Sequence, residues 1–293
     1  MTQYNVISVL PFYSELREQD FRRSYAYGDV YPLYTPAGQI LPFQLLTPHV
    51  SANAISSVVM KKIDGTTVAD ITSLLTEGGM RVKEYASDGY DIISYPSIMP
   101  LGMNTLEGQY YIELTCTAGT FYSEVFTVVG DISGFLKVEW RMLDDLIGFG
   151  WRIQYNSGQY AFRNVVYLNT ELGKPDYEFE ETGESRDGYF FPERMISEKT
   201  YKFQFLAPEY LCDVLRFVRM ADEVVVTDKY GRKYLCDQFL TTVKWQAQGN
   251  IANVEAEFQT DTVAKAIGRA IPPTNLGAFN EDYNNDYDIT PTT

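Results

Sequence analysis

The 293-residue sequence is poor in histidine, cysteine and positive charge, and each shortage excludes a class of function. Its single histidine, His49, excludes an HExxH motif and any zinc or iron site that takes two histidines from one chain. A serine or cysteine hydrolase with a histidine base would have to use this same residue. Its position between Pro48 and Val50 is more typical of an ordinary loop or strand residue than of a catalytic base.

Positive charge is scarce, because 24 Lys and Arg stand against 39 Asp and Glu, for a formal net charge of -15. Binding to a phosphate backbone needs clustered Lys and Arg, so we expect no specific binding of nucleic acid. The sequence also contains no GxGxxG, GxxxxGK(S/T) or GxSxG motif, the patterns that cradle nucleotide phosphates or present a catalytic serine. We therefore expect no cofactor and no catalytic residue.

The three cysteines, Cys116, Cys212 and Cys236, are separated by 96 and 24 residues. These spacings match neither a disulfide framework nor a metal-binding CxxC pair. We predict free thiols that are buried as small apolar side chains, as expected for a protein assembled in a reducing cytoplasm.

Uninterrupted apolar runs are also missing. The N-terminus lacks the positively charged start of a secretion signal, and Pro11 ends its short apolar run. The stretch 30–60 carries no charge, but prolines and polar residues interrupt it, whereas a spanning helix needs about 20 mostly apolar residues. We therefore expect no membrane insertion.

Aromatic residues are abundant, with 23 Tyr, 17 Phe and 3 Trp, and strand patterns dominate the chain. The sequence predicts a mainly β fold, built of β-sandwich domains with one flanking helix. We divide it into an N-terminal arm at 1–45, an immunoglobulin-like β-sandwich at 46–130, a second β-sandwich at 131–270 and a flexible acidic tail at 271–293. Alone, the tail has too little apolar surface to fold.

Short strands fill the first predicted sandwich, and the turn Asp64-Gly65 joins two of them as a hairpin. Tyr110 follows Gly108 near the start of a strand, as in the tyrosine corner of immunoglobulin-like sandwiches, although an ordinary strand tyrosine fits equally well. In the last of these strands Phe121, Val125 and Val129 are predicted to share one face. The predicted strands are 56–63, 66–72, 80–85, 88–95, 108–115 and 121–129.

Seven carboxylates crowd the segment 171–187, against only Lys174 and Arg186. Because like charges close in sequence repel and stay solvated, we interpret this segment as a solvated or partner-facing loop. The alternating ligands of an EF-hand are missing, so a Ca²⁺ site is the less favoured alternative.

The segment 200–260 has the clearest pattern, with the order strand, helix, hairpin, hairpin. The helix is predicted at 208–219, with Pro208 in its first turn and a buried stripe at helical spacing. This stripe comprises Leu211, Val214, Leu215 and Val218. The apolar face of the closing strand comprises Ala252, Val254, Ala256 and Phe258.

Two features of the C-terminal half belong together. One is the run Glu184-Ser-Arg186-Asp187-Gly188, which leads into a long β-hairpin, and the other is the element order of 200–260. Together they resemble the tail-tube-like β-sandwich of tailed bacteriophages, which recurs in tube proteins and in the distal tail proteins of baseplates. The resemblance covers roughly residues 131–265 and rests on element order. Distal tail proteins usually place this domain first, whereas here it follows the 46–130 domain.

The resemblance implies a virion structural protein that is made in the bacterial host cytoplasm. It implies a homo-oligomeric ring, six-fold or a multiple of six, which joins strand edges around a lumen and contacts other tail or baseplate proteins. DNA would pass through an acidic lumen without binding. Subunit contacts are expected from the arms 25–36 and 279–287 and from the loop 178–194. The interface candidates are Tyr25, Tyr27, Tyr31, Tyr34, Glu178, Glu180, Glu181, Arg186, Phe190, Phe191, Arg194, Phe279, Tyr283 and Tyr287.

Two other functions stay open. A carbohydrate-binding or adhesin-type β-sandwich would use aromatic platforms, for which Trp140, Trp151 and Trp245 are candidates, although packing is favoured because each lies in a predicted strand. A carboxylate-pair hydrolase would need two acids about 5–10 Å apart in a cleft, which sequence alone does not place.

Overall fold

The computed structural model describes residues 8–20, 30–48, 55–72, 81–85, 90–95, 107–116, 119–142, 162–186, 188–246 and 249–266. The chain forms two compact units. Unit 1 comprises residues 1–175 and 201–260, and unit 2 comprises residues 176–200 and 261–293.

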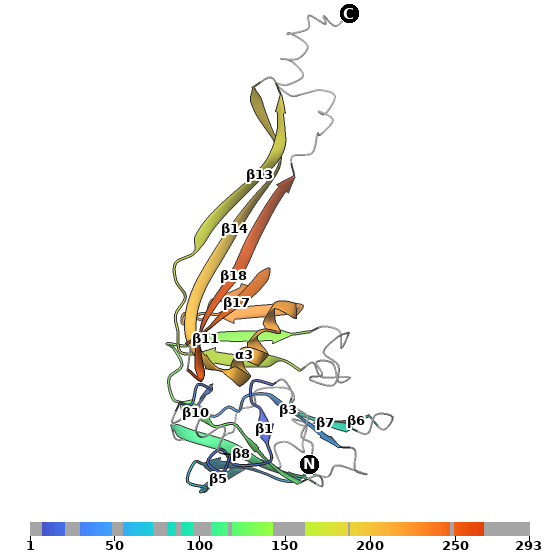
Figure 1. Cartoon of the computed structure of the whole chain (residues 1–293), viewed down its shortest axis with the longest axis vertical. Helices are drawn as coiled ribbons and strands as arrows, with labels where there is room; N and C mark the ends of the chain where they lie inside the picture. Colours follow the sequence, from blue (N-terminus) through green and yellow to red (C-terminus); the bar gives the residue numbers. More distant parts are fainter. Residues whose placement is uncertain are drawn as a thin grey trace, which may run out of the picture. The chain divides into compact units, whose positions relative to one another are not determined.

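A seven-stranded sheet forms the N-terminal part of unit 1 (Figure 1). Its strand β8 (Gly108–Cys116) pairs with β4 (Ile55–Lys62) along one edge and with β9 (Gly119–Ser123) and β10 (Phe126–Val129) along the other. The turn at Gly65 joins β4 to β5 (Thr67–Asp70), which confirms the predicted hairpin. Finally, β1 (Phe12–Tyr13) pairs with β9, and β2 (Tyr34–Pro36) runs parallel to β10.

A three-stranded antiparallel sheet packs on this one. Its order is β3 (Phe43–Pro48), β7 (Tyr90–Tyr95), β6 (Arg81–Tyr85). The ring centroid of Phe43 lies 4.7 Å from that of Phe12 and 5.4 Å from that of Tyr95, and all three side chains are buried. They belong to the same core as Ile112 and Leu114 of β8, so the two sheets share one apolar interior, as in a β-sandwich.

The stretch 121–129, predicted as one strand, is broken into β9 and β10. Between them, the side chain of Glu124 is buried, and its carboxylate lies 3.7 Å from the guanidinium of Arg17, which is also buried. The break shifts the alternation, so that Phe126 faces the core and Val129 is only half-buried. The prediction that Phe121 and Val129 share one face is therefore wrong, because residues 124 and 125 separate β9 from β10 and Phe126, not Val129, pairs on the core side of β8.

Glycine at position 108 leaves room for a buried phenol. Tyr110 is 1% exposed, and a Cβ at Gly108, whose φ is +153°, would lie 3.3 Å from the hydroxyl of Tyr110. Any larger residue at 108 would therefore crowd the phenol. The tyrosine-corner hydrogen bond itself stays a prediction.

The predicted domain boundaries also stay predictions. The segment 1–45, predicted as an arm, contributes β1 and β2 to the seven-stranded sheet. Unit 1 groups these residues with the predicted 46–130 domain and with most of the predicted 131–270 domain. The boundaries of the two compact units therefore differ from the domain boundaries predicted from the sequence.

Two four-stranded sheets come from the C-terminal half. One has the order β12 (Asn164–Leu168), β11 (Leu136–Arg141), β15 (Glu223–Thr227), β16 (Lys233–Leu235). The other has the order β13 (Asp176–Arg186), β14 (Tyr189–Pro208), β18 (Ile251–Ala266), β17 (Gln238–Trp245). The strands β14 and β18 each run from one unit into the other.

Aromatic rings join these two sheets inside unit 1. Phe258 of β18 lies 5.4 Å from Tyr201 of β14 and 6.0 Å from Tyr234 of β16, between ring centroids. The predicted apolar face of β18 is buried at all four positions, from Ala252 to Phe258. These contacts confirm the mainly β fold with packed sheets.

One helix, α3 (Glu209–Leu215), flanks the sheets, and the whole predicted stripe from Leu211 to Val218 is buried. The helix is shorter than predicted, since Pro208 is its N-cap and a separate 3-10 helix, η3 (Val218–Met220), follows. The N–H of Phe217 donates to the carbonyl of Val214 at 3.1 Å, a three-residue bond that tightens and ends the α-helical turn.

We predict that Phe258→Ala lowers the free energy of unfolding by about 3–5 kcal/mol, because it leaves a cavity where several aromatic rings meet. Those rings belong to Tyr201, Phe203, Tyr234 and Phe239. Urea unfolding followed by circular dichroism measures the loss.

The matched control is Val263→Ala, on the same strand and 63% exposed, which should change the unfolding free energy by less than about 0.5 kcal/mol. Equal losses in the two variants would contradict the buried position of Phe258.

Candidate functional site

The segment 176–186, predicted as part of an acidic loop, is a strand. Figure 1 shows β13 running antiparallel beside β14, with the register extending from Asp176 opposite Thr200 to Arg186 opposite Tyr189. Gly188 closes the turn with a φ of 83°, a conformation that glycine adopts at little cost. The loop prediction is wrong for this part because a strand exposed on both faces keeps its acids solvated. Among the described residues of the segment, 171–175 have an irregular backbone.

The two faces of this hairpin differ in chemistry. Because successive side chains of a strand alternate, Tyr177 and Phe179 lie on one face, and Glu178 and Glu180 lie on the other. On that second face Glu178 stands opposite Glu198. We name the first the aromatic face and the second the acidic face.

A β-bulge adds a third ring to the aromatic face. The register shifts between Thr182 and Gly183, and Glu193 is the extra residue of β14. Ser185 therefore stands opposite Phe190, which places Phe190 on the aromatic face. Without the extra residue, the alternation would place Phe190 on the acidic face.

The aromatic face is open to solvent. The side chains of Tyr177, Phe179 and Phe190 are 64%, 75% and 52% exposed. Tyr189 is 72% exposed on the acidic face, where it stands opposite Arg186. Exposed aromatic groups of this kind mark interaction sites, because aromatic side chains are enriched in interfaces.

The interface residues predicted within 178–194 all lie on this hairpin. The side chains of Glu178, Glu180, Glu181, Phe190 and Arg194 are exposed. For Arg186 and Phe191 the structure describes only the position in the strand.

The candidates of the predicted arms lie elsewhere or outside the described residues. Tyr34 is in β2, with its ring 5.0 Å from that of Phe135, and the guanidinium of Arg17 lies 4.5 Å from the ring centroid of Tyr31. Both tyrosines are half-buried within unit 1, and their interface role stays a prediction. The candidates outside the described residues are Tyr25, Tyr27, Phe279, Tyr283 and Tyr287.

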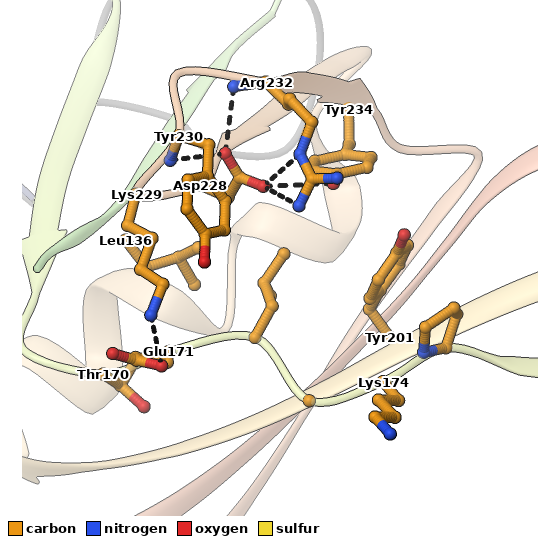
Figure 2. Close-up of a pocket in the computed structure, with 13 residues that line it drawn as sticks. Leu136, Thr170, Glu171, Lys174, Tyr201, Asp228, Lys229, Tyr230, Arg232 and Tyr234 are labelled. Atoms are coloured by element: carbon orange, nitrogen blue, oxygen red, sulfur yellow. Dashed lines mark hydrogen bonds and ion pairs between the residues drawn. The ribbon is translucent and has the colours of Figure 1, made fainter. Parts of the chain in front are cut away.

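A pocket of about 230 Å³ in unit 1 lies between the segment 170–175 and the turn that joins β15 to β16 (Figure 2). The carboxylate of Asp228 holds this turn. It accepts hydrogen bonds from the backbone N–H groups of Tyr230 and Arg232, both at 2.9 Å, and from Arg232 Nε at 2.7 Å. The hydroxyl of Tyr234 donates to it at 3.2 Å, so Asp228 positions both Arg232 and Tyr234 at the pocket.

The charges of this pocket are fixed at neutral pH. Burial by itself would raise the pKa of Asp228, but hydrogen bonds from Arg232, Tyr230 and Tyr234 outweigh burial and lower it. Burial raises the pKa of the Tyr234 hydroxyl, and a hydrogen bond to Glu171 raises the pKa of Lys229. The carboxylate is therefore ionised, the tyrosine neutral and the lysine charged.

Other carboxyl groups with shifted pKa values lie in turns or at the end of a strand. Hydrogen bonds to the residue two positions further on lower the pKa of Asp64, Asp70 and Asp131. A general acid that works at neutral pH needs a raised carboxyl pKa. These groups therefore lend no support to a carboxylate-pair hydrolase.

All three cysteines are free thiols, as predicted, with Cys116 and Cys212 buried and Cys236 half-buried. Burial raises the pKa of Cys212 to about 11 and that of Cys236 to about 12. Neither thiol is therefore a thiolate at neutral pH, so neither is activated as a nucleophile.

The tryptophans do not form one platform in the described residues. Trp140 is 1% exposed in the core, whereas Trp245 is 47% exposed on β17. Trp151 and His49 lie outside the described residues.

Neither a metal-binding cluster nor a membrane-spanning helix is present in the described part of the chain. No group of three or more His, Cys, Asp or Glu side chains there is arranged to hold a metal ion. No helix there has the length and apolar composition needed to cross a membrane.

Sequence reasoning missed Tyr177 and the pocket residues Asp228 and Arg232. The alternation of aromatic and acidic residues from Tyr177 to Glu180 is a strand pattern. The high density of acidic residues around it led to the prediction of a loop. For Asp228 the signal was its position at the start of a turn that contains Gly231. The carboxylate of an aspartate there often accepts a hydrogen bond from the backbone N–H two residues later.

Comparisons with known proteins were made by family model, by sequence and by structure. No family model and no curated protein matches the chain. One matching solved structure is the crystal structure of Dpr2 Ig1-Ig2 in complex with DIP-Theta Ig1-Ig3, at 9% identity and a TM-score of 0.14. The match covers 82% of this chain and 94% of that chain, and at such a TM-score it carries no argument.

We predict that Asp228→Asn lowers the free energy of unfolding by about 1–3 kcal/mol at pH 7, because the turn loses a charged acceptor of several hydrogen bonds. The folded-state pKa of Asp228 is lowered, so its stabilisation is present above its unfolded pKa of about 3.9 and is lost as pH falls through the folded value. Urea unfolding of both proteins between pH 2.5 and 7, about the range of this titration, measures the difference.

The two proteins should converge in stability only at the acid end of this series. A difference that stays constant to the lowest pH, or that vanishes already near neutral pH, would contradict the ionised, hydrogen-bonded state of Asp228.

Proposed function

We propose that this protein is a structural subunit of a bacteriophage tail, baseplate or head–tail ring, and that its β13–β14 hairpin makes the subunit contacts. The aromatic face of the hairpin, formed by Tyr177, Phe179 and Phe190, carries the proposal. Exposing such rings to water is unfavourable in a monomer, whereas a neighbouring copy would bury them.

The edge of the hairpin supports the same role. β13 is the terminal strand in the order β13-β14-β18-β17, so one of its edges has no partner strand in the described structure. An unpaired strand edge 11 residues long is a template for pairing with another chain. A head-to-tail contact that closes into a ring would cover the same edge in every subunit.

The acidic face limits how the exposed strand edge can pair. Glu178 and Glu180 place like charge on this edge strand, which opposes uncontrolled pairing of identical strands. Where such a face lines a lumen, like charge would let DNA pass without binding. Other tail or baseplate proteins would meet the ring at its ends.

We predict that the double variant Phe179→Ser and Phe190→Ser shifts the protein toward monomer, with at least a tenfold increase in the dissociation constant, about 1.4 kcal/mol or more. Both rings are exposed on the aromatic face, so their loss removes two of the three rings that a partner would cover. Sedimentation velocity over a concentration series, together with negative-stain microscopy, measures assembly.

The matched control is Tyr189→Ser, which removes a similarly exposed ring from the opposite face of the same hairpin. It should assemble like the unchanged protein. Equal effects of the control and the double variant would contradict the assignment to the aromatic face, and a wild-type protein that stays monomeric at every concentration would contradict ring formation.

A further inference from the structure

The sheet that carries the hairpin ends in β13 on one side and in β17 on the other, and each of these strands has one edge without a partner strand in the described structure. On β13 the side chains at 177–180 are all exposed. On β17 the helix η3 contacts the strand and Phe239 is buried, but the side chains at 242–245 are all exposed. Each terminal strand therefore offers an exposed stretch beside an open edge.

The exposed stretch of β17 has apolar groups on one face and a cation on the other. Val243 and Trp245 are 36% and 47% exposed and share a face, because successive side chains of a strand alternate. Lys244 lies between them on the opposite face, where its ammonium donates to Glu255 at 2.6 Å. An ammonium has three donors, so a second carboxylate can still bind. This alternation is the counterpart of β13, in which aromatic rings alternate with glutamates.

The directions of the two terminal strands suit pairing between copies. β13 is antiparallel to β14, and β17 is antiparallel to β18. β14 and β18 are also antiparallel, because Lys202 contacts Glu257 whereas Gln204, two positions later, bonds Glu255, two positions earlier. The terminal strands therefore run in opposite directions. In a copy related by rotation about an axis along the strands, β13 would meet β17 as an antiparallel neighbour.

Pairing of β13 with a second β13 is less favourable. Acids occupy every second position from Asp176 to Glu180, so an antiparallel self-pairing sets carboxylates either opposite one another or opposite aromatic rings. Like charges directly opposite each other destabilise a sheet. β16, a terminal strand of the other C-terminal sheet, has only three residues, which is short for a partner of an 11-residue strand.

We propose that β13 of one copy adds to β17 of the next copy as an antiparallel strand, in the register that sets Glu178 opposite Lys244. This register pairs apolar groups with apolar groups on one face and opposite charges on the other, the combinations that stabilise neighbouring strands. The three pairs are Tyr177 with Trp245, Glu178 with Lys244, and Phe179 with Val243.

Other registers match these side chains less well. A shift of two residues one way would set Glu181 opposite Val243, and a shift the other way would set Pro175, which lies outside β13, opposite Trp245. The contact joins unit 2 of one copy to unit 1 of the next, so it is head-to-tail, the kind of contact that closes into a ring. The inference rests on the proposed subunit role and adds the surface that receives the hairpin.

Exchange of charges tests the register in the full-length chain. Glu178→Lys and Lys244→Glu should each raise the dissociation constant of assembly about fivefold at low salt, because each sets like charges opposite one another. The combined exchange should return most of the lost affinity. The matched control is Lys202→Glu, which removes a lysine that also pairs with a glutamate of β18 but lies on β14, and it should leave assembly unchanged. Sedimentation velocity measures the constants, and circular dichroism confirms folding.

Cross-linking tests which strands meet. We use a Cys236→Ser background, because Cys236 is the one half-buried thiol and the other two are buried. On mild oxidation, an equimolar mixture of Phe179→Cys and Val243→Cys proteins should form disulfide-linked dimers. Opposite residues of antiparallel strands have Cβ atoms about 4.5–5.5 Å apart, close enough for a disulfide after a small shift. Neither variant should form dimers alone.

The outcomes separate this inference from the proposed function. Rings that form without rescue by the combined exchange, or without dimers in the mixture, would overturn the pairing of β13 with β17 and leave ring assembly standing. Dimers of the Phe179→Cys protein alone would also overturn it, since β13 would then pair with itself. A wild-type chain that stays monomeric at every concentration would contradict the proposed function and this inference with it.

Discussion

The two-residue alternation of one strand, β14, is the constraint on which the C-terminal half depends. In its second half Tyr201, Phe203, Phe205 and Ala207 face the core of unit 1, while the residues between them face water. The first half, in unit 2, forms the hairpin with β13. A slip of one residue would expose the aromatic core and bury charges, so the core fixes the alternation of the second half of the strand.

The bulge at Glu193 lies between the half of β14 that packs in the core of unit 1 and the half that forms the hairpin tip with β13. Strict alternation would put Phe190 on the face of the hairpin that carries Glu178 and Glu180. One extra residue moves Phe190 to the face of Tyr177 and Phe179, opposite Ser185, and moves Phe191 to the other face, opposite Glu184. The bulge therefore decides which rings the hairpin presents on each face, and the rings of the aromatic face are the basis of the proposed assembly.

Much of this fold could be predicted from the sequence, because local periodicity reports burial directly. The apolar face of β18 and the helical stripe from Leu211 to Val218 are examples. What sequence could not supply were contacts between distant residues. Glu124, buried at the break between β9 and β10, is paired with Arg17 over a hundred positions away, and β13 pairs along its length with β14. The pocket likewise combines 170–175 with the turn at Asp228, which no local pattern connects.

The central claim is that the protein assembles into closed rings through the hairpin, and electron microscopy of the purified full-length chain tests it most directly. The account predicts closed rings of uniform size, with strand-edge contacts and the β13–β14 hairpin at the subunit boundary. Isolated monomers at all concentrations, or rings in which the hairpin contacts no neighbouring subunit, would contradict it.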